Sequence, residues 1–246
     1  MSEPHPFRAL WDAAMRRLRA YHRYEVVGGE HVPRVGAAVV ASTHSLATYE
    51  NFLLGSLSLD ELGRRPYIMA DDLMFRVPWL GEGFRQIGLV PGRREVAQRL
   101  LEAGELIGLG PGGMREALRS SRRRYQFDWQ GRLGFVWVAM LAGAPIVLAA
   151  CPGADEIYTV YENRLTPWAY GRFHVPAPLF RGRGPTPLPR PVKLVHVLDA
   201  PIPSPVAPDR VREADVEHHH RHLVRRMHAL MLRAVEITDA KRREDG

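Results

Sequence analysis

The chain has 246 residues, of which 46% are apolar and 25% charged, and it carries a formal net charge of +7 with one cysteine, Cys151. This is the balance of an ordinary globular protein with a sizeable core, and a lone cysteine excludes an intrachain disulfide framework and suits a reducing compartment. A basic surface suits phosphorylated ligands, anionic lipid headgroups or nucleic acid, without choosing among them. The first residues show no long apolar core of the signal-peptide kind.

The first predicted element is a helix over residues 6–22. Its apolar side chains recur at helical spacing, and its arginines lie mostly off that face. Two interpretations stay open. The helix either packs on the domain core or lies in a membrane interface, for which tryptophan and leucine opposite arginine are typical.

The rest of the chain alternates between strand and helix patterns. Strands are predicted at 24–27, 37–41, 66–70, 88–90, 105–109, 145–150 and 193–198. Helices are predicted at 48–57, 79–86, 94–103, 132–141 and 210–240. Residues 171–191 are rich in proline, glycine and arginine and are expected to form an irregular loop. The alternation predicts an α/β fold with a mostly parallel sheet flanked by helices on both faces, in a single domain with N- and C-terminal helices.

Residues 133–153 form an uncharged stretch whose length approaches that of a membrane span. The sequence Gly-Ala-Pro at 143–145 interrupts it. A buried helix followed by a turn and a buried strand explains the same residues, and we favour that interpretation over an integral membrane anchor.

Three loops are expected to leave the carboxyl ends of predicted strands, where open α/β sheets collect ligands. The first carries His44, a side chain that can take a proton from a hydroxyl near neutral pH. Glu50 lies six positions later and could bond the other ring nitrogen. The alternative is that His44 caps the following helix and Glu50 is an exposed first-turn acid.

The second and third loops carry cations and glycines. Arg93 and Arg94 precede a helix, where guanidinium groups and free N–H groups make an anion site, although two solvated arginines would look the same. Gly112 and Gly113 could bring backbone N–H groups close to a ligand oxygen, or simply form a tight turn, with Glu116 just beyond.

Other clusters have plainer interpretations. His218 and His222 could share a helix face, but no third metal ligand is evident and we expect a solvated or boundary patch. The basic run at 119–124 suits anionic headgroups, carrier phosphates or solvent, and no nucleic-acid recognition module accompanies it. A serine hydrolase is disfavoured because the chain has no Gly-x-Ser-x-Gly motif. We expect Cys151 to be core.

Three blocks together resemble the glycerolipid (lysophospholipid) acyltransferase superfamily. They read VVASTHSLATYENFLLG, then FRQIGLVPGRREVAQRLLEAGELIGLGPGGMREALRS, then AGAPIVLAACPGADEIY. Their order and spacing match the family over about residues 24–205. The Pro-Gly-Gly-x-x-Glu-Ala-Leu form is similar to the diacylglycerol-acyltransferase-like branch.

The resemblance implies roles for individual residues. His44 would be the base and Glu50 the acid of a dyad. Arg93 or Arg94 would fill the second block, and Gly112, Gly113 and Glu116 the third, as substrate-binding residues. Tyr49 stands where the family usually has aspartate, and the carboxylate comes one position later.

The resemblance also implies a reaction and its partners. A fatty acyl group would move from an acyl-CoA or acyl-carrier-protein thioester to a lipid or glycerol-type hydroxyl by direct transfer, with no metal, no tightly bound cofactor and no nucleic acid. A membrane surface is an expected partner, with the protein cytoplasmic and peripheral at the inner face. The alternative is a catalytically degraded lipid- or acyl-carrier-binding protein of the same fold. We expect residues 1–22 to form an amphipathic helix, 23–206 the acyltransferase domain and 207–246 a C-terminal helix and tail.

Overall fold

The computed structural model describes residues 6–75, 78–129, 131–163, 172 and 178–245. The strands are β1 (Glu25–Val27), β2 (Ala38–Ser42), β3 (Tyr67–Ala70), β4 (Leu89–Pro91), β5 (Leu106–Leu109), β6 (Ile146–Ala150), β7 (Thr159–Val160), β8 (Phe180–Arg181) and β9 (Val195–Leu198). The α-helices are α1 (Pro6–Tyr21), α2 (Tyr49–Leu62), α3 (Pro78–Gln86), α4 (Arg94–Glu102), α5 (Gly113–Ala117), α6 (Gly134–Leu141) and α8 (Glu213–Glu244).

Seven strands form one sheet in the order β1-β9-β6-β2-β5-β3-β4. All neighbouring pairs are parallel except β6 with β9. The predicted α/β class and mostly parallel sheet are therefore confirmed, and each of the seven predicted strands is present. The parallel pairing brings the carboxyl ends of β2, β3, β4 and β5 to one edge, where ligand sites of open sheets lie.

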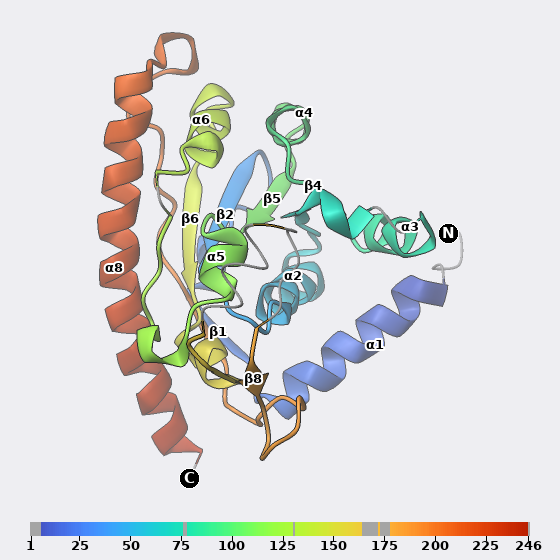
Figure 1. The fold of residues 1–246 in the computed structure, drawn as a ribbon. Coiled ribbons are helices and arrows are strands. Elements are labelled where there is room, and N and C mark those ends of the chain that lie inside the picture. Colours follow the sequence, from blue (N-terminus) through green and yellow to red (C-terminus); the bar gives the residue numbers. More distant parts are fainter. Residues whose placement is uncertain (1–5, 76–77, 130, 164–171, 173–177, 246) are drawn as a thin grey trace.

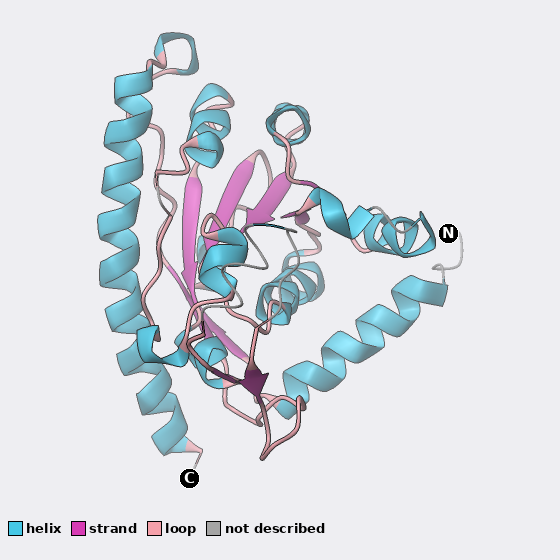
Figure 2. Cartoon of the chain, viewed as in Figure 1, coloured by secondary structure: helices cyan, strands magenta, loops and turns pink. Residues whose placement is uncertain are grey.

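Helices cover both faces of the sheet (Figures 1 and 2). Apolar side chains of α4, α6 and α8 pack on one face in a core that includes Val39, Ile107 and Leu148. On the other face, Leu54 of α2 packs on Val40 and neighbouring strand residues. Burial on both faces explains why the central strands read as unbroken apolar runs.

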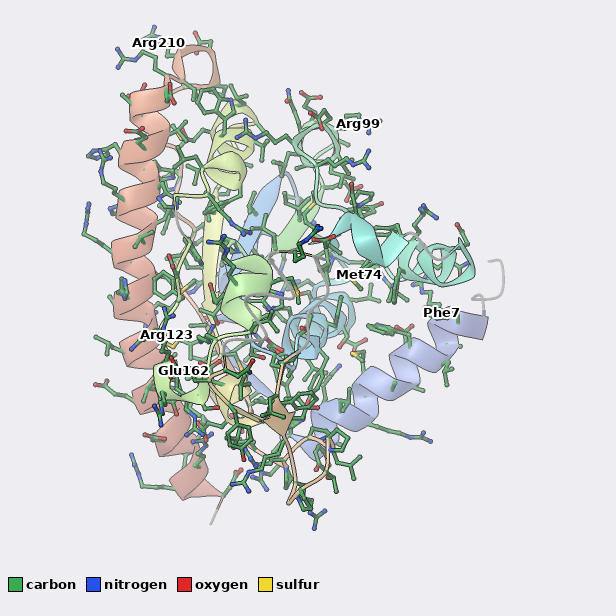
Figure 3. The ribbon with its side chains drawn as sticks, in the orientation of Figure 1. Phe7, Met74, Arg99, Arg123, Glu162 and Arg210 are labelled. Carbon is green, nitrogen blue, oxygen red and sulfur yellow. The ribbon has the colours of Figure 1, made fainter. Side chains whose placement is uncertain are left out.

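Helix α1 packs against the domain through its apolar face. Met15 is buried in a cluster with Leu53 of α2, and the Trp11 and Phe52 rings meet edge to face at 5.2 Å. Phe7, labelled in Figure 3, meets Phe84 of α3 at 6.5 Å. The core-packed interpretation of the first helix is confirmed for this face. The membrane-interface interpretation stays untested.

The uncharged stretch 133–153 is helix α6, a turn and strand β6, as expected. Gly143 takes a φ of 61° in the turn, a left-handed conformation that glycine adopts readily. Within the described parts of the chain, no helix has the length and apolar character needed to cross a bilayer.

The structure differs from the predicted elements in three places. Residues Phe180–Arg181 lie inside the predicted loop 171–191 but pair with β7 as strand β8. An antiparallel pair of only two residues can form even where prolines precede and follow it. The rest of the predicted loop lies partly outside the described residues. Helix α2 runs on to Leu62, which packs against the core. The glycine loop continues into the short helix α5. The division into segments 1–22, 23–206 and 207–246 stays a prediction.

Candidate active site

The loops that follow β2, β3, β4 and β5 surround a cavity of about 700 Å³. Its lining includes His44, Arg93, Arg94 and Gly113 from the three predicted loops. Met74, labelled in Figure 3, lines it from the segment after β3. The structure therefore brings most of the predicted site residues to one cavity. Glu50, Gly112 and Glu116 are not among the residues that line it. The catalytic and binding roles stay predictions.

His44 presents a neutral imidazole to this cavity. Its Nδ1 lies 3.1 Å from the backbone oxygen of Ser45. A carbonyl can only accept a hydrogen bond, so Nδ1 carries the hydrogen and Nε2 keeps its lone pair. Burial lowers the pKa of His44 to about 4, which keeps the ring unprotonated at neutral pH. Nε2 therefore keeps a lone pair that can accept a proton, which is what the predicted role of a base requires.

Glu50 contacts the backbone of the His44 loop instead of the imidazole. Its Oε1 accepts a hydrogen bond from the Ser45 N–H at 3.0 Å, and among the described residues no hydrogen bond joins it to the His44 ring. The expected carboxylate–imidazole contact is therefore not formed; the Ser45 carbonyl holds Nδ1 in its place. The alternative of an exposed first-turn acid is also wrong, because Glu50 is 1% exposed.

Replacing Glu50 with glutamine is expected to make folding stability less sensitive to pH. Burial raises the pKa of Glu50 to about 7 from 4.5, so between these values the folded protein holds a proton that the unfolded chain has lost. This contribution stabilises the fold below pH 4.5 and is lost as the pH rises through about 7. Relative to wild type, the unfolding free energy of E50Q should rise by about 1 kcal/mol per pH unit in that window. Urea denaturation at several pH values between 4.5 and 7 measures both unfolding free energies. A difference between E50Q and wild type that does not change with pH would contradict the raised pKa of Glu50.

Glu116 supports the same loop from α5. Its Oε1 accepts a hydrogen bond from the His44 N–H at 2.7 Å, and its side chain is 1% exposed. Glu116 and Glu50 thus hold the consecutive N–H groups of His44 and Ser45, which is a positioning contact. The substrate-binding role expected for Glu116 stays a prediction.

Arg119 completes the support and was missed as a site residue. It donates to the backbone oxygen of His44 at 2.7 Å and to both carboxylate oxygens of Asp155 at 2.5 Å. Its Nη1 also lies 3.5 Å from Glu116 Oε1, and the arginine side chain is 8% exposed. The expectation that residue 119 belongs to a solvated or headgroup-binding run is wrong, because these carboxylates hold it inside. Its spacing of three residues from Glu116 is the one signal the sequence offered.

The glycines of the third loop serve close packing. A Cβ on Gly112 would lie 1.8 Å from Glu116 Oε2, and one on Gly110 would lie 3.0 Å from the His44 ring. The Gly113 N–H already donates to the Gly110 carbonyl at 3.0 Å. Of the two glycines expected to bring N–H groups to a ligand oxygen, Gly113 is therefore committed to the turn. A donor role for Gly112 stays a prediction.

The arginines at the cavity differ in their pairing. Arg93 is exposed and donates to Asp72 at 2.7 Å and 3.0 Å. Arg94, at the start of α4, lines the cavity beside Gly134, and Arg132 lines it beside Gly113. For Arg94 and Arg132, no ion pair is recorded with any described residue. Arg132 was not predicted as a site residue because it stands alone in the sequence, at the start of the helix predicted over 132–141; in the structure that helix begins at Gly134.

An apolar arm of the cavity runs between α2 and the sheet. It is lined by Val40, Leu54, Gly55, Ile68, Leu106 and Gly108. The two glycines leave room where larger side chains would meet. The cavity thus joins an apolar interior to a mouth that carries arginines.

The residue in the usual aspartate position has another partner. The Tyr49 hydroxyl lies 2.7 Å from Nε2 of His22, whose Nδ1 lies 2.8 Å from the Val192 oxygen. Tyr49 therefore ties α2 to the end of α1.

His218 is exposed and His222 is half-buried, as expected of a solvated or boundary patch on α8. The neighbouring His219 and His220 are buried, and His220 lies 6.3 Å from the Trp129 ring. Across the part of the chain that the structure describes, no three histidine, cysteine or acidic side chains are grouped to hold a metal. Cys151 is buried, as expected of a core residue.

Comparison with known proteins gives a consistent picture. The profile of the family described as Acyltransferase matches residues 23–151. The mouse (Mus musculus) protein named DGAT1/2-independent enzyme synthesizing storage lipids is 31% identical over 204 residues, 79% of this chain and 59% of that protein. An uncharacterized protein of Mycobacterium tuberculosis is 34% identical over 192 residues, 76% of this chain and 51% of that protein.

A solved structure shares the fold. The crystal structure of the 1-acyl-sn-glycerophosphate (LPA) acyltransferase PlsC from Thermotoga maritima matches with a TM-score of 0.54 at 16% identity, over 89% of this chain and 76% of that one. The present chain spans between about half and three fifths of the length of the curated relatives above. The family profile covers more than half of the chain, and the chain belongs to the Acyltransferase family.

Proposed function

We propose that the protein is an O-acyltransferase that moves a fatty acyl group from an acyl-CoA or acyl-carrier-protein thioester to a lipid or glycerol-type hydroxyl. The observation that carries this proposal is the neutral His44 imidazole at a cavity that joins an apolar arm to an arginine-bearing mouth. Family membership and the storage-lipid relative support acyl transfer to a lipid. No tightly bound cofactor is required.

The proposed reaction is a direct transfer. Nε2 of His44 takes the proton of the acceptor hydroxyl while the oxygen attacks the thioester carbonyl carbon. The carbon–sulfur bond then breaks, and the leaving thiolate takes the proton back from the imidazolium. The Ser45 carbonyl holds the tautomer that this requires.

The apolar and the charged parts of the cavity suit different parts of the substrate. We place the acyl chain in the apolar arm, where burial of each methylene group favours binding by about 0.8 kcal/mol. Arg94 and Arg132 suit the phosphates of the thioester carrier or of the acceptor, because guanidinium groups bind phosphate oxygens in pairs.

Filling the apolar arm is expected to shorten the acyl chain that the protein accepts. A Cβ on Gly108 would lie 3.9 Å from Ile68 Cγ1, so valine fits the backbone while its methyl groups occupy the arm. Gly108→Val should lower kcat/KM for long-chain thioesters about tenfold and leave short-chain thioesters nearly unchanged. Equal losses of kcat/KM for long-chain and short-chain thioesters would contradict the placement of the acyl chain in the apolar arm.

Measurement of thiol release separates transfer from binding. An acyl-CoA panel is mixed with the protein, with and without monoacylglycerol, diacylglycerol, lysophosphatidate and long-chain alcohols. The proposal predicts acceptor-dependent release of the thiol. Binding of acyl-CoA without thiol release would instead support the second candidate, a non-catalytic lipid- or acyl-carrier-binding protein, which the Glu50–Ser45 contact and the Tyr49–His22 pair favour.

We also propose that the protein works in the cytoplasm, peripherally at the inner face of the membrane. The net charge of +7 supports attraction to anionic lipids. Fractionation of cells that express the full chain, followed by a high-salt wash of the membranes, tests this location.

A further inference from the structure

The two-stranded ribbon β7–β8 has one packed face and one exposed face. Alternation along the strands places Val160 and Phe180 on the packed face, where the Phe180 and Tyr158 rings lie 5.1 Å apart. The opposite face carries Tyr161, which donates its N–H to the Leu179 oxygen at 2.8 Å, together with Leu179 and Arg181. Tyr161 is 41% exposed and Leu179 is 61% exposed.

The turn that follows β8 extends this surface. Arg183 donates its N–H to the Leu188 oxygen at 2.7 Å, and Leu188 is 61% exposed. We call Tyr161, Leu179, Arg181, Arg183 and Leu188 the ribbon surface. It combines exposed apolar side chains with guanidinium groups, the mixture that lies in membrane interfaces.

The ribbon is fixed beside the His44 loop. The Val160 N–H donates to Ser121 Oγ at 2.8 Å, in the segment just after α5. Tyr158 and Val160 share a small hollow with Leu46, two residues after His44. Figure 1 shows β8 at the end of the molecule where α5 and α2 follow their strands. The packed face of the ribbon therefore lies close to the loop that carries His44, and the ribbon surface is on the opposite face of the same two strands.

The charge of this region is mostly positive: Glu162, next to Tyr161, pairs with the exposed Arg122 at 3.7 Å. The sequence contains no aspartate or glutamate between Glu162 and Asp199, while arginines recur through the segment. Among the described residues, no ion pair is recorded for Arg181 or Arg183. Their guanidinium groups are thus left to meet anions from outside the chain.

We propose that the ribbon surface docks on an anionic lipid bilayer, with its leucines and tyrosine in the headgroup region and its arginines on lipid phosphates. An anionic bilayer is favoured because its negative phosphates complement the arginines of the ribbon surface. The exposed leucines suit the boundary between headgroups and acyl chains. The orientation rests on the proposed function: docking here would bring a lipid acceptor to the loop that carries His44. Docking itself needs no catalysis.

Vesicle flotation with the full chain tests the proposal. The probes are vesicles of phosphatidylcholine alone and of phosphatidylcholine with phosphatidylglycerol. Leu179→Glu combined with Leu188→Glu should lower partitioning into the anionic vesicles about tenfold or more, because each change removes an apolar anchor and adds a repelled charge. Leu232→Glu on α8 is the matched control, since Leu232 is 71% exposed and lies on the long C-terminal helix, and it should change partitioning little.

Two further variants complete the test. Leu10→Glu on α1, where Leu10 is 70% exposed, separates the ribbon from the first helix. Leu179→Ser alone covers the case in which the double variant fails to fold. Loss confined to the ribbon variants supports the proposal. Absence of wild-type binding, equal binding to neutral vesicles, or loss that follows Leu10 instead would overturn it, and an acidic carrier protein would then be the partner to test. Thiol release with a water-soluble acceptor reports on the proposed function separately.

Discussion

Replacing His44 with asparagine is expected to lower kcat for acyl transfer about a thousandfold while the fold stays intact. Asparagine can keep a donor near the Ser45 carbonyl, which now lies 3.1 Å from Nδ1, but it has no nitrogen that can take the acceptor's proton. Binding of the thioester should change little, because His44 is one of many residues that line the cavity. Steady-state kinetics and circular dichroism measure the two effects.

His31→Asn is the matched control for this prediction. The His31 Nδ1 also lies within hydrogen-bond distance of a backbone oxygen, that of Leu198 at 3.2 Å, and His31 does not line the cavity. Its replacement should leave kcat within about twofold. Wild-type rates in H44N, or equal losses in both variants, would exclude His44 as the base.

Removing the Glu116 carboxylate is expected to destabilise the protein by about 3 kcal/mol, because a buried ion pair loses one partner. In Glu116→Ala, Arg119 would keep only Asp155 as a charged partner, and the His44 N–H would lose its acceptor. The loop that carries the base would then lose its fixed position. Urea denaturation should show the loss of stability, and activity should fall with it.

Two variants separate this effect from a general loss of charge. Glu82→Ala breaks an ion pair with Arg85 at the same spacing of three residues, but that pair is exposed. Its removal should change the unfolding free energy by less than about 0.5 kcal/mol. Glu116→Gln keeps an oxygen for the His44 N–H and should recover part of the activity lost in Glu116→Ala. Equal stability losses at Glu82 and Glu116 would contradict the buried support.

The sequence predicted the sheet well because its strands are buried on both faces. Runs such as residues 37–41 and 145–150 are apolar without interruption, which identified the strands of the seven-stranded sheet. The short strands β7 and β8 carry no such pattern, since two residues cannot show a period. Helix α5 was missed because three glycines lie at or just before its start.

The site was predicted less completely, for reasons of backbone path. Spacing brought Glu50 near His44, but its partner depends on the turn between them, where Thr48 takes a φ of 63°, a conformation rare for threonine. Asp155 reaches Arg119 from the short 3₁₀ helix Pro152–Glu156 after β6. This contact joins distant segments, and a single sequence does not reveal it. Residue types and spacing could identify only the loops at the carboxyl ends of the strands that surround the cavity.

The central claim is that the His44 imidazole promotes formation of an acyl ester from a thioester in this cavity. The most direct test mixes an isotope-labelled acyl-CoA with candidate lipid acceptors and measures the lipid products by mass spectrometry, for wild type and H44N side by side. We predict that the labelled acyl group appears in an ester made by wild type and is nearly absent with H44N. Labelled free fatty acid alone, or equal ester yields from the two proteins, would contradict the claim.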